Sequence, residues 1–115
     1  MVKTNEDFWK ALDELIKTSE IVLDRPKGSA HPKYPDLIYP VDYGYLKDTT
    51  SMDGGGIDIW VGTVKEKKLD AIICTVYSLK RDSEIKLLLG CNEEEKEKIY
   101  TLHNEKDMKG IMIKR

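Results

Sequence analysis

One short stretch of this chain, Asp53-Gly54-Gly55-Gly56-Ile57-Asp58, combines residue types and a spacing that could do chemistry. Two carboxylates flank three glycines, and glycines let the backbone turn sharply with positive φ, so both Asp side chains can point at one place. Hard divalent cations such as Mg²⁺ prefer carboxylate oxygens in such a loop, with phosphate from a substrate completing the shell. The same six residues also fit an ordinary tight turn, so both interpretations stay open.

A tyrosine-rich segment, residues 39–45, comes just before this stretch and reads Tyr-Pro-Val-Asp-Tyr-Gly-Tyr. Tyr39, Tyr43 and Tyr45 share one face of an expected strand. Tyrosine packs its ring in a core while its hydroxyl reaches a polar partner. We therefore expect one or two of these tyrosines to be core residues, with Tyr43 a candidate for a site.

The elements that must position these residues follow an α+β order. Thr4 or Asn5 can cap a helix that runs to about Thr18, because Phe8, Trp9, Leu12, Leu15 and Ile16 recur at helical spacing. A second helix is expected at residues 93–104, where an acidic first turn suits the helix dipole. Strands are expected at residues 20–24, 37–39, 43–46, 57–64, 70–79 and 84–89, with a short closing strand at 111–113.

These elements predict a mainly β (α+β) fold, a small five-stranded OB-like Greek-key barrel with an N-terminal and a C-terminal helix. We expect a single domain over residues 1–115. Its N-terminal helix would occupy residues 1–18, the barrel and the site residues 19–90, and the C-terminal helix and strand residues 91–115.

Composition limits the class of protein. The chain has 115 residues, of which 40% are hydrophobic and 35% charged, as in ordinary globular proteins. No apolar run approaches the roughly 20 residues that span a membrane, and the first residues lack the apolar centre of a signal peptide, so we expect a cytoplasmic protein. The net charge is −2, and no basic stripe suggests a nucleic-acid partner. Cys74 and Cys91 are expected to pack as small apolar residues.

Four patches, in order along residues 20 to 90, resemble the soluble, Mg²⁺-dependent (family I) inorganic pyrophosphatases, and the chain looks like a compact relative of them. The segments at 39–45 and 49–58 resemble the family's Tyr-Pro-x-Asn-Tyr-Gly segment and its Asp-Gly-Asp-Pro-apolar-Asp signature. Two further patches complete the resemblance: Val22 to Pro26 with Lys33-Tyr34, and Asp82, Glu84 and Lys86.

The resemblance implies Mg²⁺-dependent hydrolysis of inorganic pyrophosphate or a related phosphoanhydride. The exposed strand edges of so small a barrel favour self-association, so we expect a homo-oligomer. The resemblance implies that Lys33, Lys86 and Tyr43 contact phosphate, and that Tyr39 and Asp24 border the site, with Asp24 holding Lys33 or a water on the metal. It implies that the chemistry depends on Asp53, Asp58, Lys33 and Tyr43. The metal ligands that it implies are Asp53, Asp58, Asp82 and Glu84.

The chain also departs from the family pattern. Gly55 stands where the signature has its middle Asp, which the family uses to activate the attacking water, and Pro35 stands where the family has an acidic residue. The segment that carries the family's phosphate-gripping Arg is missing, which makes Arg25 and Lys27 candidates to replace it. His103-Asn104-Glu105 replace a Tyr-Lys pair, and His103 is expected at the surface or as a helix cap.

These departures leave two alternatives open. The first is a catalytically degenerate family member that binds Mg²⁺ or a phosphorylated ligand without hydrolysing it. The second is an OB-type nucleic-acid-binding module, which would stack bases on exposed aromatic side chains in a basic groove.

Overall fold

The computed structural model describes residues 5–115 and begins with helix α1 (Glu6–Thr18). Asn5 is the N-cap, and its side chain accepts a hydrogen bond from the backbone N–H of Asp7 at 2.8 Å. The other expected cap, Thr4, lies outside the described residues. The helix is confirmed and packs through buried Trp9 and partly buried Leu12 and Ile16, whereas Phe8 and Leu15, two other members of the predicted apolar repeat, are exposed.

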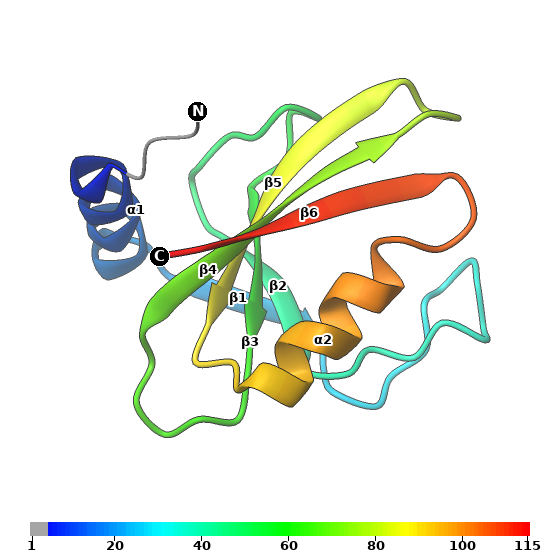
Figure 1. Ribbon diagram of the computed structural model, residues 1–115, viewed down its shortest axis with the longest axis horizontal. Helices are drawn as coiled ribbons and strands as arrows, with labels where there is room; N and C mark the ends of the chain where they lie inside the picture. The colour runs from blue at the N-terminus through cyan, green and yellow to red at the C-terminus, as the bar shows by residue number, and fades with distance from the viewer. Residues whose placement is uncertain (1–4) are drawn as a thin grey trace.

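Six strands form one sheet in the order β1-β2-β3-β5-β4-β6, and only β3 and β5 pair in parallel (Figure 1). The strands are β1 (Ile21–Arg25), β2 (Asp42–Leu46), β3 (Ile57–Val61), β4 (Leu69–Tyr77), β5 (Asp82–Leu89) and β6 (Met108–Lys114). Helix α2 (Glu93–Leu102) lies between β5 and β6 in sequence. The mainly β, OB-like class is confirmed, although the sheet has six strands where five were predicted.

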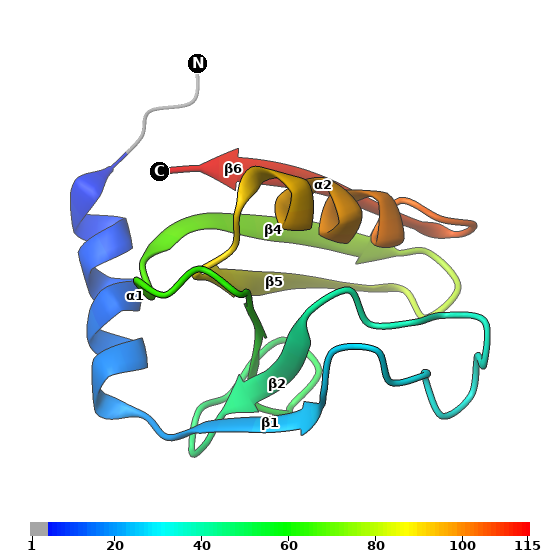
Figure 2. The same ribbon diagram turned by 90° about the horizontal axis from the view of Figure 1, so that it is seen from below.

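The predicted strand at residues 37–39 is wrong. Only one bridge, between Ala30 and Ile38, forms there. Pro32, Pro35 and Pro40 crowd this segment, and proline cannot donate a ladder hydrogen bond. The segment instead becomes part of the long loop between β1 and β2, which projects from one end of the molecule (Figure 2).

The two faces of the sheet carry two separate core clusters, and the two helices lie well apart (Figures 1 and 2). The cluster with Trp60, Ala71 and Leu88 also includes Ile99 of α2. The cluster with Ile59, Ile72 and Leu87 includes Trp9 of α1. Because side chains alternate along a strand, even-numbered residues of β3 and β5 face the first cluster, and Asp58, Glu84 and Lys86 therefore share its face. No helix of the described residues is long and apolar enough to cross a membrane.

Candidate active site

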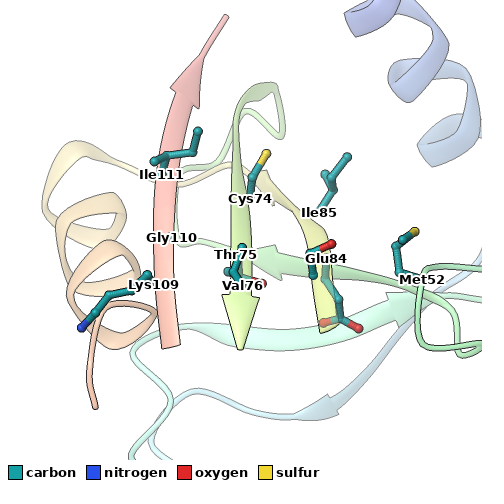
Figure 3. Close-up of a pocket in the computed structure, with 10 residues that line it drawn as sticks. Met52, Cys74, Thr75, Val76, Glu84, Ile85, Lys109, Gly110 and Ile111 are labelled. Atoms are coloured by element: carbon teal, nitrogen blue, oxygen red, sulfur yellow. The ribbon is translucent and has the colours of Figure 1, made fainter. Parts of the chain in front are cut away.

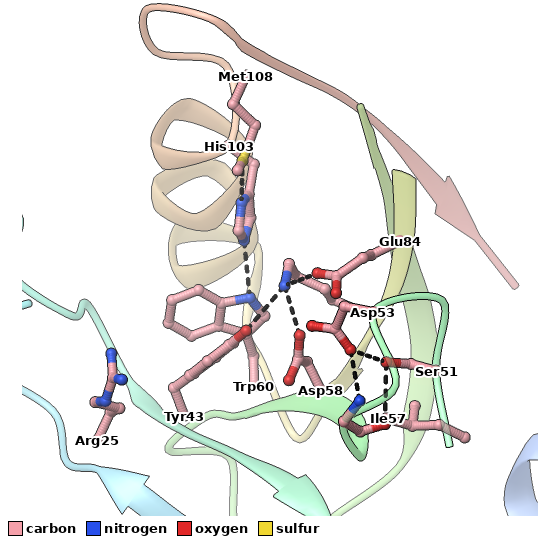
Figure 4. Close-up of polar contacts among 12 residues, drawn as sticks. Arg25, Tyr43, Ser51, Asp53, Ile57, Asp58, Trp60, Glu84, His103 and Met108 are labelled. Carbon is pink, nitrogen blue, oxygen red and sulfur yellow. Dashed lines mark hydrogen bonds and ion pairs between the residues drawn. The ribbon is translucent and has the colours of Figure 1, made fainter. Parts of the chain in front are cut away.

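The centre of the candidate site is the ammonium group of Lys86, whose side chain is only 7% exposed. Its Nζ donates hydrogen bonds to Asp58 Oδ2 at 2.7 Å, to Glu84 Oε2 at 2.9 Å and to the Tyr43 hydroxyl at 2.9 Å. These residues come from β2, β3 and β5, which are neighbours in the sheet. Four of the residues predicted for the site are therefore brought together (Figure 4).

The glycine loop before β3 brings Asp53 to the same place. Asp53 Oδ1 accepts hydrogen bonds from the Ser51 hydroxyl at 2.8 Å and from the backbone N–H of Gly55 at 2.9 Å. Gly54 has a φ of 84°, a conformation that glycine adopts without strain. The loop is thus a tight turn that also directs the carboxylate of Asp53 toward Glu84 (Figure 4).

Burial and charge act in opposite directions on Lys86. Burial by itself lowers the pKa of this ammonium, but the oxygens of Tyr43, Asp58 and Glu84 outweigh that effect and leave the pKa above its usual value. Burial raises the pKa of the Tyr43 hydroxyl well above its ordinary value. At neutral pH the site therefore holds a charged lysine next to a neutral tyrosine, and both can donate hydrogen bonds to an anion.

Asp53 and Glu84 form a carboxyl pair whose pKa values move apart. A hydrogen bond from Glu84, followed by those from Ser51 and Gly55, lowers the pKa of Asp53 to about 2. Burial, followed by the hydrogen bond to Asp53, raises the pKa of Glu84. Asp53 is therefore the carboxylate that stays ionised, and Glu84 is the member of the pair that holds a proton more tightly.

We expect Asp53 to add stability that acid removes. Its folded pKa of about 2 lies below an unfolded value of roughly 3.9, so its contribution is complete above about pH 4 and is lost as the pH falls toward 2. The side chain is exposed, so solvent screening reduces the contribution to about 1 kcal/mol. Urea unfolding of wild type and Asp53→Asn at pH 5 and pH 2.5 measures it.

The stability difference between wild type and Asp53→Asn should shrink at the lower pH. Asp36→Asn, which changes an exposed carboxylate outside the site, is the control and should leave the pH profile as in wild type. Parallel profiles for wild type and Asp53→Asn would contradict this assignment.

Asp53, Asp58 and Glu84 fit Mg²⁺ in their chemistry, because all three offer hard carboxylate oxygens. Glu84 Oε1 is buried and, when Glu84 is ionised, has no hydrogen-bond donor, so a cation beside it would satisfy this oxygen. In the arrangement seen here, the Lys86 ammonium is the cation that satisfies the other oxygen of Glu84 and Asp58 Oδ2. Within residues 5–115 no three Asp, Glu, His or Cys side chains converge on one point as metal ligands do.

A second group of predicted residues lies around Tyr39. Tyr39 is only 5% exposed, and its hydroxyl accepts a hydrogen bond from Arg25 Nη1 at 2.6 Å. The His31 ring stacks on Tyr39 with its centroid 6.3 Å away. The half-buried guanidinium of Arg25 therefore lies beside Tyr39. Arg25 is one of the two candidates to replace the family's phosphate-gripping Arg.

Besides Tyr39, three predicted residues, Lys33, Asp24 and Asp82, have no hydrogen bond to the Lys86 cluster in the described structure. Lys33 and Asp24 are exposed, and no ion pair joins them in the part of the chain described. Asp82 is half-buried at the start of β5, opposite Tyr77. Its even position on the strand places it on the face of Glu84 and Lys86.

Ser51 is a further site residue that was not predicted, although its spacing two residues before Asp53 could have indicated it. His103 was expected at the surface or as a helix cap. His103 is indeed the C-cap of α2, but its ring is buried and 5% exposed, where Nε2 accepts a hydrogen bond from Trp60 Nε1 at 3.1 Å. No local pattern in the sequence pairs residues 60 and 103.

A depression of about 440 Å³ lies on strands β4, β5 and β6, near the carboxylate cluster (Figure 3). Its walls include the exposed apolar side chains of Val76, Ile85 and Ile111. Glu84 is the one residue of the Lys86 cluster among its lining residues. Lys86 and Tyr43, the two anion-binding groups of the cluster, therefore lie outside this depression.

Comparisons with known proteins agree with this geometry at the level of the fold. No family model matches the chain, and no curated protein matches it. Among solved structures, an inorganic pyrophosphatase from Helicobacter pylori is similar, with a TM-score of 0.56 and 15% identity over 82% of this chain and 81% of that chain. An inorganic phosphatase from Anaplasma phagocytophilum is similar too, with a TM-score of 0.56 and 14% identity over 82% of this chain and 81% of that one. The chain thus has a pyrophosphatase-like fold.

Proposed function

We propose that this protein hydrolyses inorganic pyrophosphate, or a closely related phosphoanhydride, and that it needs Mg²⁺ to do so. One observation supports this most strongly. Lys86, an anion-binding group, contacts Asp58, Glu84 and the Tyr43 hydroxyl directly, and Asp53 is beside Glu84, all within a pyrophosphatase-like fold.

In this proposal the chain's own residues have two kinds of role. Lys86 and Tyr43 donate hydrogen bonds to phosphoryl oxygens, because both carry protons at neutral pH and converge within 2.9 Å of each other. Asp53, Asp58 and Glu84 would hold Mg²⁺, and Asp82 from the same face of β5 would join them. Lys33, Tyr39 and Asp24 border the substrate.

When bound, Mg²⁺ would neutralise the charge of pyrophosphate and lower the pKa of the attacking water. Lys86 then exchanges its contacts with Asp58 and Glu84 for contacts with the substrate anion. Tyr43 stays beside Lys86 and orients the leaving phosphate. Phosphoryl transfer needs little covalent work from the protein, so positioning and charge supply most of the catalysis.

The substrate class can be tested with three compounds. We expect the purified chain with Mg²⁺ to release phosphate fastest from pyrophosphate, more slowly from ADP, and slowest from p-nitrophenyl phosphate. Lys86 and Tyr43 offer hydrogen bonds to phosphoryl oxygens, and neither of them lines the apolar depression beside Glu84 that could receive a ring. Faster release from the phosphomonoester than from pyrophosphate would contradict the proposed substrate.

A second candidate function, binding of Mg²⁺ or a phosphorylated ligand without hydrolysis, is favoured by Gly55. No carboxylate stands at this position, and loss of a general base typically costs about 10² to 10⁴ in rate. The φ of Gly55 is not positive, and an added Cβ would meet only Asp53 Oδ1 at 3.3 Å, so a side chain fits there with small adjustments.

We therefore expect Gly55→Asp to raise the rate of pyrophosphate hydrolysis by about tenfold or more. Gly55→Asn, which adds the same bulk without the charge, is the matched control and should give no increase. A large increase from an almost inactive wild type would favour the non-hydrolytic function for the natural chain. Equal rates in both variants would show that position 55 lies outside the reaction.

Nucleic-acid binding receives less support from the structure, because the aromatic rings packed beside Tyr43, Tyr39 and Trp60, are buried at 5% and 1% exposure and cannot stack on bases, although Phe8, Tyr34 and Tyr100 elsewhere are exposed. Salt-sensitive binding to single-stranded DNA would reverse the preference for a phosphoanhydride.

We propose a cytoplasmic location for the protein. We also propose a homo-oligomeric state, since the sheet leaves β1 and β6 as edge strands.

A further inference from the structure

A buried line of contacts connects the end of α2 with the Lys86 cluster. At its start, His103 Nδ1 lies 3.2 Å from the sulfur of Met108, and His103 Nε2 lies 3.1 Å from Trp60 Nε1 (Figure 4). The Trp60 ring then packs against Tyr43, with centroids 4.4 Å apart. The Tyr43 hydroxyl accepts a hydrogen bond from Lys86 at 2.9 Å.

The hydrogen bond between Trp60 and His103 fixes which ring nitrogen of His103 carries the proton. An indole N–H can only donate, so His103 Nε2 must accept, and the ring proton must sit on Nδ1, where it faces the Met108 sulfur. Burial, and then the charge of Lys86, lower the pKa of His103 to about 3. The ring is therefore neutral at ordinary pH and keeps a single orientation.

The Trp60 indole is tightly packed, so the orientation that His103 gives to it also affects the site residues that it contacts. Trp60 is 1% exposed and contacts Tyr43 and Tyr39 on the site side. Protein interiors are packed as densely as organic crystals, so a rotated indole must displace its neighbours. Tyr43 is the neighbour that contacts Lys86.

We propose that His103 is a positioning residue, which fixes Trp60 by accepting its N–H and thereby sets Tyr43 and Lys86 in place to receive a phosphate anion. The catalytic consequence rests on the proposed function. His103 touches no predicted substrate position itself, and it acts only through Trp60 and Tyr43.

Three variants separate this role from a general contribution to folding. His103→Leu fills similar space but cannot accept a hydrogen bond, and we expect kcat/KM for pyrophosphate to fall about tenfold, mainly through a higher KM. His103→Gln offers an oxygen near the position of Nε2 and should stay within about threefold of wild type. Leu102→Ala, which trims a neighbouring side chain packed on the same core cluster, is the control for lost packing.

A nuclear magnetic resonance readout makes the test independent of turnover. The chain has two tryptophans, so Trp9→Phe assigns the indole N–H signal of Trp60, and Tyr43→Phe assigns the Tyr43 ring signals. In His103→Leu both the Trp60 and the Tyr43 signals should shift. In His103→Gln and in Leu102→Ala both should stay close to their wild-type positions.

The proposal and the proposed function fail in different ways. If wild type does not hydrolyse pyrophosphate, the proposed function fails, and the Tyr43 signals alone decide whether His103 positions the site. Tyr43 signals unmoved in His103→Leu would overturn the proposal. So would a kcat/KM in His103→Leu within twofold of an active wild type, or a loss in His103→Gln as large as that in His103→Leu.

Discussion

Asp58→Asn should reduce Mg²⁺-dependent hydrolysis of pyrophosphate by about a thousandfold. Asp58 lies 2.7 Å from Lys86 Nζ, and it is also one of the four carboxylates proposed to hold Mg²⁺. Asn keeps the size of the side chain but removes its negative charge. The variant therefore loses a metal ligand and at the same time the group that orients the lysine.

Phosphate release measured over a range of Mg²⁺ concentrations checks this expectation. Circular dichroism must show that the variant is folded, and Asp36→Asn, at an exposed loop position, should keep the wild-type rate. Full activity in folded Asp58→Asn would remove Asp58 from the reaction. Activity recovered at high Mg²⁺ would leave Asp58 with a role in metal affinity alone.

Lys86→Met should have the largest effect on stability, lowering the free energy of unfolding by about 3–5 kcal/mol at pH 7. Methionine keeps most of the length of the lysine side chain but leaves the carboxylates of Asp58 and Glu84 in a largely buried place without their cation. Because the folded pKa of Lys86 is raised, its stabilisation is complete below the unfolded value of about 10.4 and is lost as the pH rises further.

Urea unfolding at several pH values measures this loss. Lys98→Met, which removes an exposed partner of Glu94, is the matched control and should cost less than about 1 kcal/mol. In an Asp58→Asn background the cost of Lys86→Met should become smaller, because one of the stranded charges is already gone. An equal cost in both backgrounds would mean that the two side chains do not stabilise each other.

Much of the scaffold could be predicted because its signals are local. Asn5 precedes an apolar helical repeat, and alternating or continuous apolar runs mark β3, β4 and β5 within a few residues of their observed ends. The strand predicted at residues 37–39 does not form, because the prolines around it, which lack a backbone N–H donor, outweigh its apolar residues. The length of β6, from 108 to 114, is set by pairing along β4, which no local pattern shows.

The site was predictable in its residue types and less so in its arrangement. Asp53, Asp58, Glu84, Lys86 and Tyr43 were all expected, and the structure brings them together. The position of Lys86 between two carboxylates depends on the parallel pairing of β3 with β5, strands that are far apart in sequence. The pairing of Trp60 with His103 spans 43 residues and likewise depends on how α2 packs on the sheet.

Hydrolysis by this chain can be tested by measuring phosphate release from pyrophosphate by the wild type, with Mg²⁺ and again with EDTA in its place. We expect turnover well above the uncatalysed rate with Mg²⁺ and none with EDTA. No turnover in Mg²⁺, at a sensitivity that detects the uncatalysed rate, would contradict the proposed hydrolysis. Binding of Mg²⁺ or of a phosphorylated ligand would then become the leading function for the Lys86 cluster.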